Sequence, residues 1–302
     1  MPISHMLLAI LVAVIWGTNF LFVKLGLEEI SPLLLGAMRF ILASIPAIFF
    51  IKPPAVPFKL VALYGFVTFA LQFSFFFIGM DVGMTPGMAS LIMQVQVFFS
   101  MLFTALLLNE PPSIWQITGA LVSFAGIGLV GLHVDKNISL MGFIFILAAA
   151  ASWGLGNLIT KKTRGANMIA LVVWGSFIAA FPMLLLSLLF EGPSRMVASY
   201  HHLSGQGITA LFYIVYASTW VGYGVWNWLL SHHSVGTIVP FTLLVPVVGL
   251  LSSVLILEEP LQPWKIIACL LVLIGLGINL LGTRLSKIKM PPQQPANSLY
   301  SK

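Results

Sequence analysis

Long apolar segments separated by short polar breaks constrain this chain more than any other feature of its sequence. A helix needs about 20 apolar residues to cross a bilayer, and ten segments approach that length. Because 59% of the residues are hydrophobic and only 7% are charged, too few polar side chains remain to cover a soluble core. We therefore expect an all-α integral membrane protein with ten transmembrane helices. The segments are 6–25, 32–51, 60–80, 85–107, 114–132, 139–160, 168–190, 206–230, 235–257 and 263–283.

The distribution of Lys and Arg indicates how these helices are oriented, because basic residues gather on the cytoplasmic side of membrane proteins. With a cytoplasmic N-terminus, nine basic residues fall inside: Lys52, Lys59, Lys161, Lys162, Arg164, Arg284, Lys287, Lys289 and Lys302. Four fall outside: Lys24, Lys136, Arg195 and Lys265. This imbalance predicts that both termini are cytoplasmic. We expect the polar, Pro-rich tail 286–302 to be disordered there.

The two halves of the chain resemble each other. The acidic turn at Glu110 reappears at Glu259, 149 residues later, and the Trp-Gly pair at Trp16 reappears at Trp153, 137 residues later. Each half holds an odd number of predicted spans, so the second half is expected to be inverted across the membrane. Inverted repeats are typical of secondary transporters, whose substrate sites lie near the midplane between the halves. The predicted repeats are 1–137 and 138–285.

Polar and aromatic side chains at helical spacing indicate which helix faces meet protein or water rather than lipid, because polar groups are costly inside a membrane. Trp16 shares a face with Asn19, and Trp153 shares one with Asn157. Gln94 and Gln96 point about 200° apart, so they cannot line one cavity equally. Hydrogen bonding between helices is the alternative role for such groups. The predicted substrate-binding residues are Trp16, Asn19, Arg39, Gln72, Gln94, Gln96, Trp153, Asn157, Tyr223 and Asn227.

Arg39 is the one charged residue well inside a predicted span. No Asp or Glu lies at a matching depth in any span, so the sequence offers no evident partner for a buried ion pair. Two roles stay open for this side chain. It attracts a substrate carboxylate or organises an outer gate, or it makes a structural contact with loop carboxylates such as Glu28, Glu29 and Asp81.

The acidic residues all fall in loops or at helix ends, which disfavours a cation pump driven by a membrane carboxylate. Zwitterionic, neutral or anionic substrates fit this pattern better. The sequence has no P-loop, no HExxH pair and no GxGxxG fingerprint, and its single cysteine excludes a Cys-rich metal site. We therefore expect a protein that is not an enzyme and has no catalytic residue, metal or cofactor. The scattered basic residues do not form a nucleic-acid-binding patch.

Several motifs resemble the EamA family of the drug/metabolite transporter superfamily. They are Trp16-Gly17-Thr18-Asn19-Phe20, Arg39-Phe40, the Glu-Pro turns, and the Gly-x-Gly of the fifth and tenth segments. The stretches 94–99, 156–162, 221–226 and 243–250 look most similar to family members that export cysteine and O-acetylserine. The resemblance implies a multi-pass exporter of amino-acid-like metabolites in the bacterial inner membrane, working by alternating access.

The alternatives within this interpretation concern substrate and coupling. A broad-specificity exporter of drugs or amphipathic compounds is one alternative, and a non-transporting receptor or scaffold is another. Proton antiport and uniport both stay open as coupling modes. The expected partners are a small amino-acid-like molecule, the lipid bilayer and, in the antiport case, protons, and the protein is expected to be a monomer.

Overall fold

The computed structural model describes residues 1–133, 139–163, 165–233 and 238–288, and within these ranges the chain is helical and forms no strand. In this part of the chain, nine helices are long and apolar enough to cross a membrane. A shorter apolar helix, Phe241–Ile256, lies where the ninth apolar segment predicts one. The prediction of an all-helical membrane protein is confirmed, while the exact number of spans stays a prediction.

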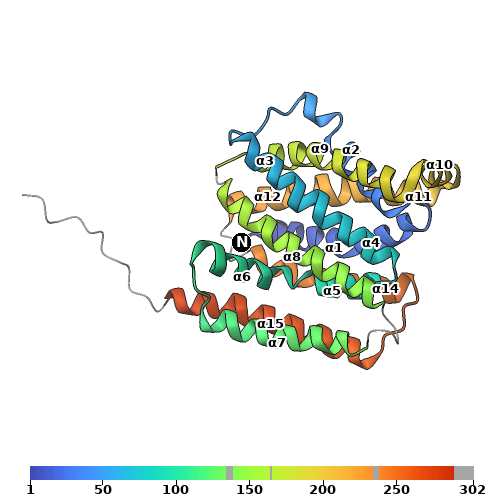
Figure 1. Ribbon diagram of the computed structural model, residues 1–302. Helices are drawn as coiled ribbons and strands as arrows, with labels where there is room; N and C mark the ends of the chain where they lie inside the picture. Colours follow the sequence, from blue (N-terminus) through green and yellow to red (C-terminus); the bar gives the residue numbers. More distant parts are fainter. Residues whose placement is uncertain (134–138, 164, 234–237, 289–302) are drawn as a thin grey trace, which may run out of the picture.

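The first half of the chain contains the helices α1 (Ile3–Leu27), α2 (Pro32–Ser44), η1 (Ala47–Phe49), α3 (Phe58–Tyr64), η2 (Gly65–Leu71), α4 (Gln72–Asp81), α5 (Pro86–Met93), α6 (Gln96–Leu108) and α7 (Ile114–Gly131). The second half contains α8 (Leu140–Lys162), α9 (Met168–Leu186), η3 (Ser187–Glu191), α10 (Gly192–His202), α11 (Gly205–Phe212), η4 (Tyr213–Val221), α12 (Gly222–His232), η5 (Val239–Leu243), α14 (Leu244–Ile256) and α15 (Pro263–Ile288). Figure 1 shows these helices running roughly alongside one another as a bundle, with α1 in its interior.

Irregular backbone geometry recurs at matching places in the two halves. The π-helical segments η2 and η4 interrupt the third and the eighth predicted spans. The fourth span breaks at Gln94 and the ninth at Leu243, 149 residues apart. Asn109 and Glu258, at the same separation, both have a left-handed backbone, with φ of 55° and 54°. The backbone irregularities therefore follow the spacing of the sequence repeat.

The helices α7 and α15 pack along each other as a pair (Figure 1). A Cβ atom at Gly119 would lie 3.0 Å from the backbone nitrogen of Asn279 and would overlap the carbonyl oxygen of Gly275. Ser123 donates a hydrogen bond of 3.2 Å to the carbonyl of Val272 at the same contact. Small residues of this kind allow two membrane helices to approach closely.

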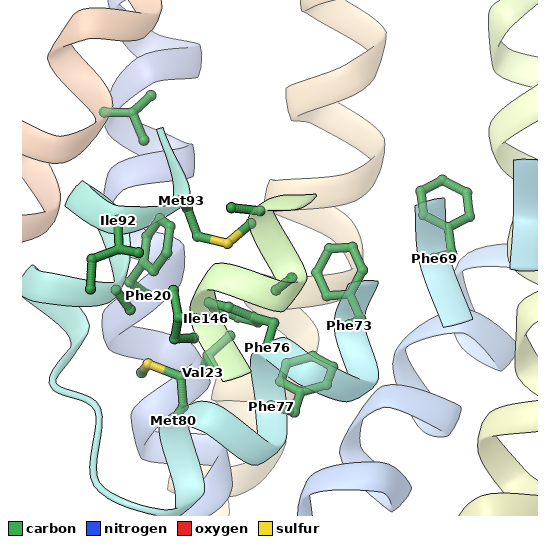
Figure 2. Packing of buried hydrophobic residues seen from close by; sticks show 14 of the residues in the cluster. Phe20, Val23, Phe69, Phe73, Phe76, Phe77, Met80, Ile92, Met93 and Ile146 are labelled. Atoms are coloured by element: carbon green, nitrogen blue, oxygen red, sulfur yellow. The ribbon is translucent and has the colours of Figure 1, made fainter. Parts of the chain in front are cut away.

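An aromatic core holds the central helices together. Figure 2 shows Phe73, Phe76 and Phe77 on the third span close to Phe20 of α1 and Ile146 of α8. The rings of Phe20 and Phe76 meet edge to face at 5.5 Å, an arrangement that aromatic pairs prefer. The core therefore joins α1 and α8, which come from different halves, through the third span.

Two connections differ from the sequence expectation. The helix α2 ends at Ser44, because the bulky ring of Pro46 disfavours helical geometry at the residue before it. The connection between the predicted segments 168–190 and 206–230 contains the helix α10, which begins at a glycine with φ of 78°. A glycine tolerates this left-handed backbone without steric cost.

Candidate functional site

An aromatic wall joins α1 to α12. The Trp16 ring lies 5.5 Å from that of Tyr223 and 5.2 Å from that of Trp226. The indole nitrogen of Trp16 donates a hydrogen bond of 3.1 Å to the carbonyl of Ser218. Because Gly222 has no Cβ, the indole can pack directly against its backbone. Two of the predicted site residues, Trp16 and Tyr223, are therefore brought together from different halves.

A second pair of predicted residues joins α6 to α8. The side-chain nitrogen of Asn157 donates hydrogen bonds to the Gln96 side-chain oxygen at 2.7 Å and to the Ser100 hydroxyl at 2.9 Å. The Asn157 side chain is nevertheless exposed. This amide cluster thus presents polar groups at an accessible surface between the two halves.

Gln94 points away from this cluster, as its helical angle predicts. Its side-chain nitrogen donates a hydrogen bond of 3.0 Å to the carbonyl of Thr242, which lies in η5. Gln94 itself sits where the fourth span is interrupted. The bond therefore ties one interrupted span to the other, and gives Gln94 a structural contact separate from that of Gln96.

Two further predicted residues carry buried acceptors without a hydrogen-bond partner. Asn19 is 8% exposed and Gln72 is 4% exposed, and the side-chain carbonyl oxygen of each has no partner in the structure. Thr68, one turn before Gln72, also has an unpartnered hydroxyl and packs against Gly156. An unsatisfied buried polar group costs about 1–3 kcal/mol. These groups are therefore suited to receive hydrogen bonds from a polar molecule.

Arg39 of α2 is buried, with 2% of its surface exposed. Its Nη2 atom donates a hydrogen bond of 3.2 Å to the Thr219 hydroxyl, and its guanidinium carbon lies 4.3 Å from the ring centre of Phe73. Its Nε and Nη1 atoms have no partner. Across the described ranges, the ion pairs are Lys161–Glu110 and Lys265–Glu259, so Arg39 takes part in neither.

The loop carboxylates proposed as structural partners of Arg39 bind other groups instead. Glu29 accepts hydrogen bonds from the backbone and hydroxyl of Ser204, at 2.7 and 2.5 Å, and Glu28 accepts one of 3.1 Å from Gln206. The hydrogen bonds from Ser204 lower the pKa of Glu29 below its ordinary value of 4.5. These contacts join the end of α1 to the start of α11, and leave Arg39 without a carboxylate.

A small cavity of about 40 Å³ opens beside Thr219. A cavity needs about 10–15 Å³ on this measure to hold one water, so there is room for a few waters or a small polar group. Tyr223 also lines it. Its lining residues are Ile169, Val172, Val173, Thr219, Trp220, Tyr223 and Gly224.

The structure gives less detail for the two remaining predicted residues, Trp153 and Asn227. Trp153 is half-buried and packs against the main hydrophobic core. Asn227 lies on α12, but its side chain is outside the described residues. The structure therefore groups the predicted residues into separate clusters between helices rather than into one continuous ring.

Glu191 is a buried residue that sequence reasoning missed. Its carboxylate accepts hydrogen bonds from the backbone of Leu33 and Leu34, at 2.7 and 3.1 Å, and from the hydroxyls of Ser31 and Ser187, at 2.8 and 2.6 Å. It thus caps the N-terminus of α2, where a negative charge is favourable. Because Glu191 is about 160 residues from α2 in sequence, no local pattern could have revealed this contact.

A cluster of histidines joins the start of α1 to the end of α12. The Nδ1 atom of His5 lies 2.7 Å from the Nε2 atom of His233, so one ring donates a hydrogen bond to the other. Desolvation and the neighbouring charges of His5, the N-terminus and His232 lower the pKa of His233. Close packing therefore favours the neutral form of His233 at this end of the bundle.

An all-helical bundle with interrupted spans and polar side chains held between its helices has the architecture of a membrane transport protein. The chain belongs to the EamA-like transporter family, which matches residues 3–132 and 140–281. The predicted resemblance is therefore confirmed, and the protein is a multi-pass transporter of the bacterial inner membrane.

Individual relatives are similar over nearly the whole chain. A probable amino-acid metabolite efflux pump of Escherichia coli K12 is 38% identical, covering 93% of this chain and 96% of the relative. A protein of the same description from Salmonella typhimurium LT2 is 38% identical with the same coverage. The uncharacterized transporter YoaV of Bacillus subtilis is 25% identical, covering 92% of this chain and 97% of its own.

One solved crystal structure has the same fold. It superposes with a TM-score of 0.65 and covers 96% of this chain and 100% of its own, at 17% sequence identity. This likeness extends to the arrangement of the helices along the whole chain. The low identity makes it evidence for the fold alone.

Proposed function

We propose that this protein is a secondary transporter that exports amino acids or related small metabolites across the inner membrane by alternating access. The observation that carries this proposal is the bond between Asn157 and Gln96, which places an accessible amide cluster between the two halves. Transporters of this kind bind substrate at such an interface. Two relatives, each described as a probable amino-acid metabolite efflux pump, support the substrate class.

We further propose that residues 1–137 and 138–285 are inverted repeats with both termini in the cytoplasm. The matching backbone irregularities and the two separate family matches support this division. With this orientation, Asn157 lies toward the cytoplasmic end of its helix, and its counterpart Asn19 lies toward the outer end of α1. Asn157 is exposed while Asn19 is buried, which fits a transporter that is open to the cytoplasm and closed to the outside.

The chemistry of the site favours small zwitterionic substrates such as cysteine and O-acetylserine. The amide and hydroxyl groups of Gln96, Asn157 and Ser100 can bind polar groups without selecting a charge. Among the described residues of the first half, Arg39 is the one buried cation. The alternative, a broad-specificity exporter of amphipathic compounds, is favoured by the apolar side chains of Val172, Val173 and Trp220 around the small cavity.

Solute flux in a purified system tests the proposal. Proteoliposomes would be loaded with labelled cysteine, O-acetylserine, threonine or an aromatic amino acid, and efflux would be followed with and without a pH gradient. We expect efflux of at least one amino acid above that of protein-free liposomes. Stimulation by an inward proton gradient would indicate antiport, and an unchanged rate would indicate uniport. Absence of flux for the whole panel, with an amphipathic dye transported instead, would favour the broad-specificity alternative.

A further inference from the structure

The guanidinium of Arg39 combines deep burial with incomplete hydrogen bonding. Its side chain is 2% exposed, yet only Nη2 has a partner, the hydroxyl of Thr219. Three of the five N–H donors of an arginine belong to Nε and Nη1, and both atoms are unpartnered here. A charge buried without a counter-ion is unfavourable in a membrane protein unless it serves function. Packing alone therefore does not explain why these donors are buried without a partner.

The surroundings hold this guanidinium in one orientation. The ring of Phe73 lies on one side of it, at 4.3 Å, and Phe40 lies at 5.7 Å. Thr219 accepts its hydrogen bond while donating one of 3.0 Å to the carbonyl of Ile214, five residues earlier in η4. The π-helical geometry of η4 thus fixes the hydroxyl that anchors Arg39. Because its orientation is fixed in advance, a ligand would lose little entropy in ordering this side chain.

Thr219, whose hydroxyl accepts the hydrogen bond from Arg39, also lines the small cavity of about 40 Å³ together with Tyr223. Arg39 takes part in neither of the two ion pairs found in the described ranges, Lys161–Glu110 and Lys265–Glu259. One fixed cation matches one monoanion, and a planar guanidinium matches the geometry of a carboxylate.

We propose that Arg39 is the receptor for the substrate's carboxylate, so that the transporter selects amino acids and other small monocarboxylates over amines and neutral analogues. This inference rests on the proposed transport function and names the chemical group that the site recognises. The carboxylate reaches Arg39 when the helices around the cavity separate during the transport cycle. Thr219 and Phe73 act as positioning residues, because they hold the guanidinium rather than the ligand.

Ligand binding to the purified, detergent-solubilised protein tests this assignment without relying on transport. The ligands are cysteine, cysteinamide and cysteamine, followed by phenylalanine, phenylalaninamide and phenethylamine. Within each series the carboxylate is first neutralised and then removed, while the side chain is unchanged. Affinity is measured as the ligand-induced shift of the melting temperature over a concentration series. The proteins compared are wild type, Arg39→Gln, Arg39→Lys and, as a control for loss of a cation, Lys161→Gln.

We expect wild type to bind the amino acid at least about tenfold more tightly than its amide, in the range of one charge-assisted hydrogen bond. Arg39→Gln removes that preference, Arg39→Lys keeps part of it, and Lys161→Gln keeps all of it. Equal affinity of wild type for acid and amide, a preference that survives in Arg39→Gln, or no binding of any amino acid would each overturn the assignment. If Arg39→Gln does not fold, the wild-type and Arg39→Lys series still decide.

The flux assay separates this inference from the proposed function. A protein that prefers carboxylates through Arg39 but moves none of them across a membrane would refute the proposed transport and leave the carboxylate site in place. A protein that exports amino acids and their amides at equal rates and affinities would refute the carboxylate receptor and leave transport in place.

Discussion

Asn157 of α8 donates a hydrogen bond of 2.7 Å to Gln96 of α6, and the bond joins the second half of the chain to the first. The same nitrogen also reaches Ser100, one turn further along α6. Asn157 is exposed, and its hydrogen bonds also hold two helices together. The pair therefore offers a direct way to separate a structural role from a substrate-binding role.

Replacing either amide of this pair by an apolar residue is expected to reduce transport. Asn157→Leu and Gln96→Leu each remove one partner, and we expect each to lower the efflux rate by about tenfold. Since the two residues act as a unit, the double variant is expected to be no worse than the poorer single variant. Efflux from proteoliposomes with equal amounts of folded protein measures this. Strict additivity of the two losses would show that the residues act independently.

Glu191 is expected to stabilise the fold through its cap on α2. Glu191→Ala leaves the backbone donors of Leu33 and Leu34 without a partner, and should cost about 2 kcal/mol of stability. Glu110→Ala is the matched control, because Glu110 forms only an exposed pair with Lys161. Thermal melting of the purified variants measures both. Equal melting temperatures for the two variants would contradict the role of the cap.

The contact between α7 and α15 is expected to depend on one glycine of α7 and not on another. A Cβ atom at Gly119 would overlap the Gly275 carbonyl, whereas one at Gly128 would meet nothing within 4 Å. Gly119→Ala should therefore destabilise the protein by about 1–3 kcal/mol. Gly128→Ala should be neutral or stabilising by up to about 1 kcal/mol, because alanine favours a helix. The melting temperatures of the two variants test this prediction. A lower melting temperature for Gly128→Ala than for Gly119→Ala would show that the two helices do not meet at Gly119.

The contact between Glu29 and Ser204 is expected to depend on pH. The pKa of Glu29 is lowered in the folded protein, so its contribution to stability is complete above the ordinary value of 4.5 and is lost as the pH falls through the lower, folded value. Wild type should melt above Glu29→Gln at about pH 7, and the difference should shrink as the pH falls below the ordinary pKa of 4.5. Glu28→Gln serves as the neighbouring control. A difference in melting temperature that grows as the pH falls would contradict this prediction.

Much of the fold could be predicted from the sequence, because lipid restricts each span to a long apolar helix. The Pro-containing breaks located the turns, and the acidic turns at Glu110 and Glu259 predict a repeat. The early end of α2 was missed although Pro46 marks it in the sequence, because the apolar run continues to residue 51. The helix α10 was missed because it lies in a mixed sequence between two predicted spans. The boundaries of the helices therefore needed the structure.

Residues of the candidate site could be predicted from the sequence, but the contacts between them could not. Helical spacing selected Trp16, Gln96 and Asn157, yet it could not show that Asn157 bonds to Gln96 or that the ring of Trp16 contacts that of Tyr223. Thr219 was missed because its contact with Arg39, 180 residues earlier in the chain, depends on how two helices pack. Pairing between distant helices depends on how they pack, which a single sequence does not reveal.

The central claim is that the interior of this bundle carries an amino acid through the membrane, and substrate efflux from proteoliposomes tests it most directly. We would compare wild type with Asn19→Ala, Gln96→Ala and Asn157→Ala, using Thr118→Ala as a control, because its exposed hydroxyl bonds only within its own helix. We predict amino-acid efflux by wild type and Thr118→Ala, and a marked loss in the interior variants. Undiminished efflux in all three interior variants would contradict the account.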